Sequence, residues 1–236
     1  MLISVYKCGN LHLERFSIWM IGENQMKIIL AGDSTVANCP QDEAPMAGWG
    51  QYLSNYVSYP VLNHAKGGST TQSFVQEDRW DMVCQLIEPK DVVCIQFGHN
   101  DQKPEHKIYS EDYYQNISQM VKDVQTQGGR PILLTPPERN NFFRDRHFPT
   151  LEKEATIIQT VAKEQGIPCL PLHTYTKESY AANGEHKNRQ FFVWLEPGQS
   201  KNYPRGYRDN THFTEKGARW LASWIGEQLQ VYLTNE

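Results

Sequence analysis

The stretch MKIILAGDSTVA, residues 26–37, decides how the chain is organised. Its apolar run stops abruptly at Gly-Asp-Ser-Thr, which is typical of a strand that ends in a turn. Two interpretations of this ending are open. Asp33, Ser34 and Thr35 terminate the strand and cap the next helix, or Ser34 is a nucleophile presented at the strand's end. Such triplets mostly do no chemistry, so the rest of the chain has to decide between them.

Short apolar runs recur along the chain and predict five strands. They are Lys27–Ala31, Val61–Ala65, Asp91–Phe97, Pro131–Thr135 and Ile167–Leu172. Because they do not alternate with polar residues, they fit parallel strands that are covered on both faces. Segments of helical length and spacing accompany them: Trp49–Val57, Ser73–Ile87, Glu111–Thr126, Leu151–Glu164 and Thr214–Leu229. This alternation predicts an α/β fold, a three-layer α/β/α sandwich doubly wound around a five-stranded parallel sheet.

The carboxyl ends of the predicted strands carry most of the polar chemistry. The segments that follow the five strands are GDST, KGGST, GHND, PPERNNFFRDRHF and an irregular region from about residue 173 to residue 210. In doubly wound sheets, ligands bind outside these ends. We therefore expect a functional site on one rim of the sheet, within a single domain of residues 26–236.

The composition excludes several classes of protein. With 39% hydrophobic and 21% charged residues the chain resembles an ordinary globular protein, and its net charge of -4 argues against a nucleic-acid partner. No segment approaches the roughly 20 apolar residues that a membrane-spanning helix needs. The five cysteines are scattered without C-x-x-C spacing, which argues against a zinc site and against a disulfide framework. Reduced thiols in a cytoplasmic protein fit this pattern best.

The first 25 residues differ in pattern from the rest of the chain. Lys7, Glu14 and Arg15 interrupt their apolar residues, so the segment lacks the continuous apolar core of a signal peptide. Met26 begins the first clear strand. We expect residues 1–25 to be an extension from an upstream start codon or a loosely attached segment, and a variant that starts at Met26 to fold and stay active.

The segment DNTHF, residues 209–213, precedes the last predicted helix on what we expect to be a loop. An Asp three residues ahead of a His lets the carboxylate bind one imidazole nitrogen, while the other nitrogen takes a proton from a serine hydroxyl. Alternatively, Asp209 or Thr211 caps the helix and His212 is an ordinary polar residue. Ser34 and His212 are predicted on the same rim from opposite ends of the chain, which favours catalysis.

Two further segments on this rim offer hydrogen-bond donors for a developing oxyanion. Gly67 and Gly68 of KGGST lack a Cβ, which leaves their amides open to a ligand. Asn100 of GHND carries a side-chain NH2 that can donate. Each feature alone is more often a plain turn. Together with Ser34 and His212 they indicate acyl transfer.

These residues carry a family resemblance. GDST, a glycine after the second strand, GHND and D-x-T-H resemble the blocks of the SGNH (GDSL-type) hydrolases, whose fold is flavodoxin-like. Within that superfamily the chain is most similar to rhamnogalacturonan acetylesterases, from about Met26 to the C-terminus. The similar segments occur in the same order: LAGDSTVA, GWGQYL, NHAKGG, QFGHNDQK, FVWLEPG, NYP and DNTHFTEKGA.

The resemblance implies a role for each matching residue. Ser34 would be the nucleophile, His212 the general base and then acid, and Asp209 the residue that orients it. The oxyanion hole would consist of the backbone N–H groups of Ser34 and Gly68 with the side chain of Asn100. The implied reaction removes acetyl groups from acetylated oligosaccharides, in particular rhamnogalacturonan (pectin) fragments, through an acetyl-Ser34 intermediate and without a metal or other cofactor.

One departure from the family pattern concerns the substrate. Relatives often carry Arg and then Ser after the glycine of the second block, where this chain has Ser69 and Thr70. The missing guanidinium removes a bidentate anchor for a carboxylate or hydroxyls. Aromatic and hydrogen-bonding residues of the long loops are the candidate sugar contacts: Arg139, His147, Trp194 and Tyr203, with Asn140, Phe142 and Tyr207 near them.

Other classes of protein fit less well. A binuclear metallophosphoesterase would need an upstream D-x-H and histidines at ligand spacing. An α/β-hydrolase would need G-x-S-x-G, but Val36 stands at the second glycine. A non-catalytic carbohydrate-binding module leaves the Ser, Asn, Asp and His set unexplained. An SGNH esterase for another glycan, a lipid or a thioester stays open, although loops rich in Arg, Asn, His and Tyr favour a polar substrate. The resemblance does not specify the exact glycan, the position of the acetyl group or the oligomeric state.

Overall fold

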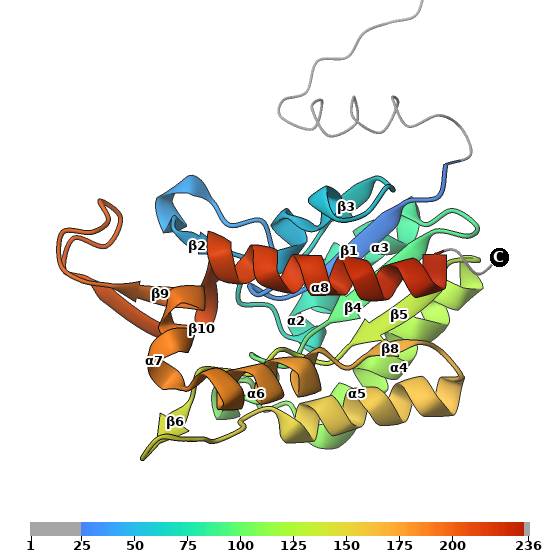
Figure 1. Cartoon of the computed structure of the whole chain (residues 1–236). Coiled ribbons are helices and arrows are strands. Elements are labelled where there is room, and N and C mark those ends of the chain that lie inside the picture. The colour runs from blue at the N-terminus through green and yellow to red at the C-terminus, as the bar shows by residue number, and fades with distance from the viewer. Residues whose placement is uncertain (1–24, 234–236) are drawn as a thin grey trace, which may run out of the picture.

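A computed structural model describes residues 25–233 and shows strands and helices in alternation (Figure 1). The main sheet contains β1 (Ile28–Gly32), β3 (Val61–Asn63), β4 (Val92–Gln96), β5 (Arg130–Leu134) and β8 (Cys169–Leu170). The strand order is β3-β1-β4-β5-β8, and every neighbouring pair is parallel. The predicted doubly wound, five-stranded parallel sheet is therefore confirmed. The predicted extension, residues 1–25, lies almost wholly outside the described residues.

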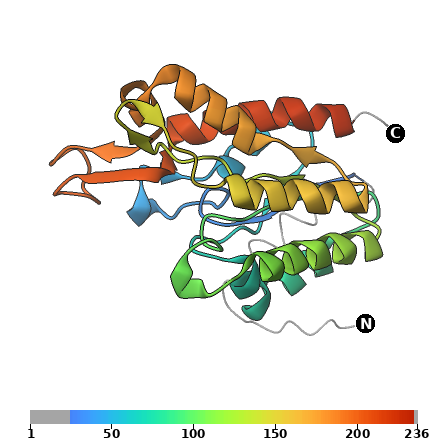
Figure 2. The same ribbon diagram turned by 90° about the horizontal axis from the view of Figure 1, so that it is seen from below.

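Helices cover both faces of this sheet, and Figure 2 shows the layers from below. On one side lie α6 (Leu172–Asn183) and α8 (Glu215–Leu233), and on the other lie α2 (Thr71–Gln76), α3 (Arg79–Leu86), α4 (Ser110–Thr126) and α5 (Glu152–Gln165). Alternate residues of β1 enter different cores, since Leu30 packs with α8 and Ile29 with α4 and α5. Burial on both faces explains why the strands read as continuous apolar runs.

The segment Trp49–Val57 is not the helix that its spacing predicts. It forms two 3₁₀ turns, η2 (Trp49–Gln51) and η3 (Leu53–Asn55). Gly50 approaches the backbone so closely that a Cβ there would lie 2.5 Å from the carbonyl oxygen of Val36. The segment contains poor helix formers, and its close packing against the turn after β1 outweighs its weak propensity for an α-helix.

The predicted helix Ser73–Ile87 is two helices. α2 begins two residues earlier because Thr70 and Ser73 form a capping box around its first turn. Between α2 and α3 the backbone turns at Asp78, which has a φ of 57°. Aspartate is one of the few residues that adopt this left-handed conformation at low cost.

The chain after β5 differs most from the prediction. The fifth strand is only two residues long, because Pro168 and Pro171 flank it and cannot donate to a ladder. The region from 173 to 210, which was predicted to be irregular, is so mainly at residues 196–206. It contains most of α6, then α7 (Glu185–Asn188), η5 (Arg189–Phe191), β9 (Phe192–Leu195) and the start of β10 (Tyr207–Thr214). Polar residues such as His173 and Thr176 occupy the buried face of α6, which hid its helical stripe.

A second, antiparallel sheet has the order β2 (Met46–Ala47)-β10-β9, and β9 and β10 project beyond the main sheet at the left of Figure 1. The segment DNTHF lies in β10, so its prediction as a loop was wrong. The register of β10 against β9 shifts between Arg208 and Phe213, which leaves Asp209 to His212 irregular within the strand. The remaining short elements are η1 (Gln41–Glu43), η4 (Pro104–His106) and the hairpin β6 (Phe142–Phe143) and β7 (Arg146–His147). None of the helices within residues 25–233 combines the length and apolarity that crossing a membrane requires.

Candidate active site

The candidate site lies at the carboxyl end of β1, where the order of the sheet reverses. The chain leaves β1 for β3 on one side and later returns as β4 on the other. The turns after these three strands therefore meet at the switch point of the sheet. A Cβ on Gly67 would lie 3.8 Å from the Cβ of Ser34. The side chain of Asn100 donates to the carbonyl of Ser69 at 3.0 Å.

Ser34, His212 and Asp209 form one hydrogen-bonded chain. The Oγ of Ser34 lies 2.9 Å from Nε2 of His212, and Nδ1 of His212 lies 2.7 Å from Oδ2 of Asp209. With its ring proton on Nδ1, a neutral His212 donates to the carboxylate and accepts from the serine hydroxyl. The ends of the sequence thus meet, because β10 carries Asp209 and His212 to the rim of the main sheet.

Asp209 is surrounded by donors. Its Oδ1 accepts from the backbone N–H groups of Thr211 and His212 at 2.6 and 2.9 Å, and its Oδ2 also accepts from the hydroxyl of Tyr207 at 3.1 Å. Burial by itself raises the pKa of Asp209, but the hydrogen bonds and charge of His212, together with these backbone donors, lower it to about 2. The carboxylate is therefore ionised at neutral pH and holds the imidazole in one orientation.

Hydrogen bonds between the buried Asp33 and Thr35 hold the turn that carries Ser34. Oδ1 of the buried Asp33 accepts from the backbone N–H of Thr35 at 2.9 Å and from its hydroxyl at 2.7 Å. Burial by itself raises the pKa of Asp33, but His99 and Thr35 bring it below its usual value. Asp33 and Thr35 thus end the strand, as the first interpretation of GDST requires, while Ser34 stays partly exposed and faces His212.

The donors predicted for an oxyanion lie beside Ser34. Within the described residues, neither the backbone N–H of Ser34 nor that of Gly68 donates a hydrogen bond. Gly68 has a φ of 78°, and a Cβ there would meet no heavy atom within 4 Å, so this side of the turn is open. Asn100 is buried, and its Oδ1 accepts from Lys103 Nζ at 2.8 Å, which fixes the orientation of its amide. No cluster of metal-ligating side chains occurs among residues 25–233.

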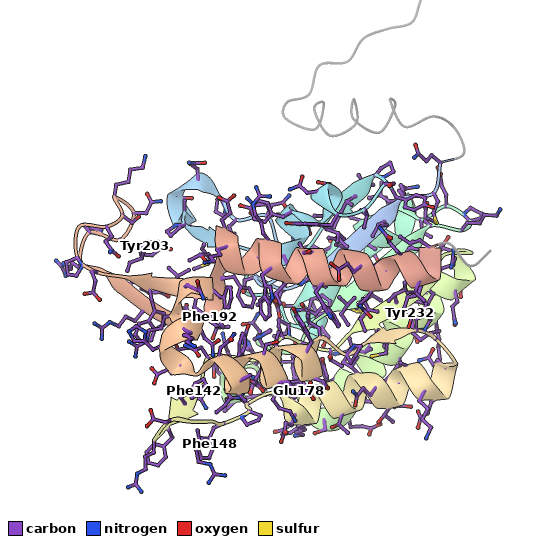
Figure 3. All side chains as sticks on the ribbon, viewed as in Figure 1. Phe142, Phe148, Glu178, Phe192, Tyr203 and Tyr232 are labelled. Atoms are coloured by element: carbon purple, nitrogen blue, oxygen red, sulfur yellow. The ribbon has the colours of Figure 1, made fainter. Side chains whose placement is uncertain are left out.

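Two of the candidate sugar contacts lie on the projecting sheet and its loop. Tyr203, labelled in Figure 3, donates to the carbonyl of Glu43 at 3.1 Å and stacks on Tyr207 with ring centroids 4.9 Å apart. Trp194 of β9 donates to Oδ1 of Asn210 at 2.8 Å, and the guanidinium of Arg189 lies 4.0 Å from the centroid of its ring.

The other two candidates make their contacts inside the protein. Arg139 donates to Oγ1 of Thr211 at 3.1 Å, to Oγ1 of Thr150 at 2.9 Å and to the carbonyl of His99 at 3.3 Å. Its guanidinium therefore joins the GHND turn to the DNTHF segment. His147 lies 2.9 Å from the carbonyl of Arg139 through Nε2 and packs beside aromatic rings.

Sequence reasoning missed the contact of Tyr207 with Asp209. Residues two apart on a strand point to the same face, so the signal was present once the segment is recognised as a strand. The bracing contacts of Arg139 had no comparable signal, because its partners come from three separate parts of the chain.

A serine, a histidine and an aspartate linked in this order at the edge of a doubly wound sheet are the arrangement of a serine hydrolase. Residues 30–220 match the family model of the GDSL-like Lipase/Acylhydrolase family, and the chain belongs to this family. It is accordingly a carboxylic ester hydrolase.

Curated relatives and a solved structure agree with this membership. The chain is 39% identical over 208 residues to the rhamnogalacturonan acetylesterase RhgT of Bacillus subtilis (strain 168), covering 87% of this chain and 90% of the relative. It is 30% identical over 211 residues to the probable rhamnogalacturonan acetylesterase YesY of the same strain, covering 86% and 92%. The crystal structure of protein YxiM from Bacillus subtilis superposes with a TM-score of 0.76 at 25% identity, covering 90% of this chain and 58% of that chain.

Proposed function

We propose that the protein is an acetylesterase that removes acetyl groups from acetylated rhamnogalacturonan (pectin) fragments through an acetyl-Ser34 intermediate. The observation that carries the proposal is the unbroken chain of hydrogen bonds from Ser34 Oγ through His212 to Asp209. The names of RhgT and YesY, with which the chain shares most of its length, support the substrate class.

The proposed reaction has two steps. Ser34 Oγ attacks the acetyl carbonyl carbon while its proton passes to Nε2 of His212, and the tetrahedral intermediate then expels the sugar oxygen, which takes that proton. Water next attacks the acetyl-enzyme, gives a proton to His212, and acetate leaves as Ser34 recovers its hydroxyl. Asp209 stays ionised throughout, because its pKa is about 2, and stabilises the imidazolium that forms in each step.

The oxyanion of each tetrahedral intermediate would accept from Ser34 N–H, Gly68 N–H and the side chain of Asn100. An amide has two N–H groups, and Asn100 uses one of them to bind the carbonyl of Ser69, so the second remains for the oxyanion. A donor fixed before the reaction needs no reorganisation when charge develops. Lys103 and Ser69 supply that fixation from both ends of the amide.

For sugar contacts we propose Tyr203, Tyr207 and Trp194, because Tyr207 and Trp194 contact Asp209 and Asn210 and Tyr203 stacks on Tyr207. Arg139 and His147 contact other parts of the protein, so their proposed part is to hold the rim in place. Ser69 is 2% exposed and carries no positive charge, so any anchor for a galacturonate carboxylate has to come from another residue.

Ser34→Ala tests the nucleophile. It should abolish acetate release from acetylated rhamnogalacturonan and from p-nitrophenyl acetate, while the exposed Ser54→Ala serves as the matched control and keeps full activity. Unchanged turnover by Ser34→Ala would remove Ser34 from the mechanism.

A substrate panel tests the pectic assignment. Acetate release from acetylated pectin, acetylated xylan and simple sugar esters should be fastest with the pectic substrate. Equal rates on all of them would overturn this preference. Activity only on acyl chains longer than acetyl would favour the alternative, a lipid esterase or thioesterase of the same superfamily.

We also propose that the enzyme acts in the cytoplasm on acetylated oligosaccharides. Among the described residues, Cys39, Cys84, Cys94 and Cys169 are unpaired thiols, which suits a reducing compartment. Fractionation of the producing cells tests this location, and recovery of the enzyme from the culture medium would contradict it.

A further inference from the structure

Two titratable residues next to the proposed catalytic groups have no part in the proposed chemistry. Asp33 directly precedes Ser34, and His99 directly precedes Asn100. Both are buried, with 0% and 2% of their surface exposed, and Oδ2 of Asp33 lies 3.3 Å from Nδ1 of His99. The contact therefore joins the turn after β1 to the turn after β4, directly beneath the nucleophile and the amide donor.

The direction of the hydrogen bonds on the Asp33 side is fixed by Trp49. An indole N–H can only donate, and it donates to Oε1 of Gln96 at 2.8 Å. The amide of Gln96 therefore donates through Nε2 to Oγ1 of Thr35, also at 2.8 Å. Thr35 then points its own hydroxyl hydrogen at Oδ1 of Asp33, at 2.7 Å.

The direction on the other side is fixed by a carbonyl. Nε2 of His99 lies 2.9 Å from the carbonyl oxygen of Pro137, which can only accept, so Nε2 carries a hydrogen. A neutral imidazole with that hydrogen would turn the lone pair of Nδ1 toward the carboxylate of Asp33. The contact between Nδ1 and Oδ2 therefore requires a second proton. The two donors of Thr35 stabilise the ionised form of Asp33, which assigns that proton to His99.

We propose that His99 is an imidazolium whose buried ion pair with Asp33 positions Ser34 against Asn100. This inference rests on the proposed function for its catalytic consequence only. Both residues are positioning residues, since they act through Ser34 and Asn100 and do not contact the reacting atoms. Other elements also present charged or titratable groups to the pair: Asp101 after β4, Tyr113 of α4, Arg139 after β5 and Glu154 of α5.

The protonation of His99 is measured by ¹H–¹⁵N spectroscopy of the full chain with labelled histidine. At about pH 7.5, an ordinary histidine with a pKa near 6.5 is mostly neutral. Both ring nitrogens of His99 should nevertheless carry a proton, and His99→Gln assigns the signals by their loss. An unprotonated Nδ1 in the wild-type protein would overturn the proposal. This measurement needs no activity, so it stands even if the proposed esterase function fails.

Asp33→Asn separates charge from hydrogen bonding. The amide oxygen of Asn still accepts from Thr35, and the amide N–H donates to Nδ1 of His99, so the variant keeps each contact and should fold. His99 should then become neutral, with its only ring proton on Nε2. A spectrum identical to that of the wild type would contradict the ion pair.

The positioning role is tested against a matched histidine. His173 is also buried and lies 3.0 Å from a buried carboxylate, that of Glu138, but it contacts none of the proposed catalytic residues. Both His99→Gln and His173→Gln should lower the melting temperature. Only His99→Gln should lower kcat on p-nitrophenyl acetate, by about 10-fold or more with KM within about twofold, since misplacement by ~1 Å costs up to 10²-fold. Equal kcat losses in the two variants, or none in His99→Gln, would refute the positioning role.

Discussion

Replacing the carboxylate of Asp209 with an amide should inactivate the enzyme more thoroughly than removing it. Asp209 accepts four hydrogen bonds, two on each oxygen, from the backbone of Thr211 and His212, from the imidazole and from Tyr207. In Asp209→Asn only one side-chain oxygen remains. The two backbone donors lie at 2.6 and 2.9 Å and hold that oxygen, so the amide NH2 takes the place of Oδ2.

The new NH2 group would reverse the polarity of the catalytic chain. It donates to Nδ1 of His212 across the present 2.7 Å contact, so the ring proton moves to Nε2 and points at Ser34. An imidazole in that tautomer cannot accept the serine proton. The same change in a serine protease lowers kcat about 10⁴-fold, equivalent to ~5.5 kcal/mol of transition-state stabilisation. In Asp209→Ala the tautomer is not forced, and water can approach Nδ1, so the loss of kcat should be smaller than in Asp209→Asn.

Initial rates on p-nitrophenyl acetate at about pH 7, with melting temperatures measured in parallel, test this ordering. The exposed Asp81→Asn is the matched control and should keep wild-type activity. If folded Asp209→Asn retained more than about a tenth of the wild-type kcat, the tautomer reasoning and the assignment of His212 as base would both be refuted.

Three further outcomes are expected. Asn100→Ala should lower kcat by roughly 10² to 10³ if its amide binds the oxyanion, and a loss below about threefold would make it structural. Gly217→Ala should destabilise the fold by about 1–3 kcal/mol in urea unfolding. The new Cβ would lie 2.2 Å from the carbonyl oxygen of Phe191, and this backbone atom cannot move aside as the end of a flexible side chain could. Stability should fall as the pH drops from about 4.5 to 2. Burial by itself raises the pKa values of Asp209 and Glu138, but hydrogen bonds from their histidine partners and neighbouring donors lower both to about 2. Each ionised carboxylate therefore stabilises the folded state above the pKa that it has in the unfolded chain, and this stabilisation is lost as the pH falls toward the folded-state pKa. Melting temperatures across this pH range should decline less in Glu138→Gln, and an unchanged decline would contradict the role of that carboxylate.

The sheet could be predicted because the apolar pattern of its strands matches their burial on both faces. The runs around Ile28–Leu30 and Val92–Ile95 are apolar on both faces, and in the structure alternate residues do enter the two cores. The secondary-structure prediction was wrong for α6, where polar residues fill part of the buried face. The buried face of α6 includes His173 and Thr176, which also bind the distant residues Thr135 and Glu138, and no local pattern reveals those partners.

The candidate site followed from the sheet, since strands that run parallel bring their carboxyl ends to one edge. Ser34, Gly68 and Asn100 each follow a predicted strand, so the sequence alone predicts that they lie together. The direction in which a loop side chain points is a different matter. Arg139 looked suited to bind sugar because it is long and charged, yet its guanidinium is bound by Thr211, Thr150 and the carbonyl of His99. Only the three-dimensional arrangement supplies those three acceptors.

The two interpretations of GDST are therefore parts of one explanation. A nucleophile at the end of a strand can be aimed only if the turn that carries it is rigid. That rigidity needs acceptors and donors which are satisfied inside the protein. Asp33 and Thr35 meet this need, because their polar atoms bind each other, Gln96 and His99 in the core. Ser34 alone has its hydroxyl directed to the rim and His212. Turn residues on either side of the serine are what a serine nucleophile requires, so finding them is no argument against catalysis.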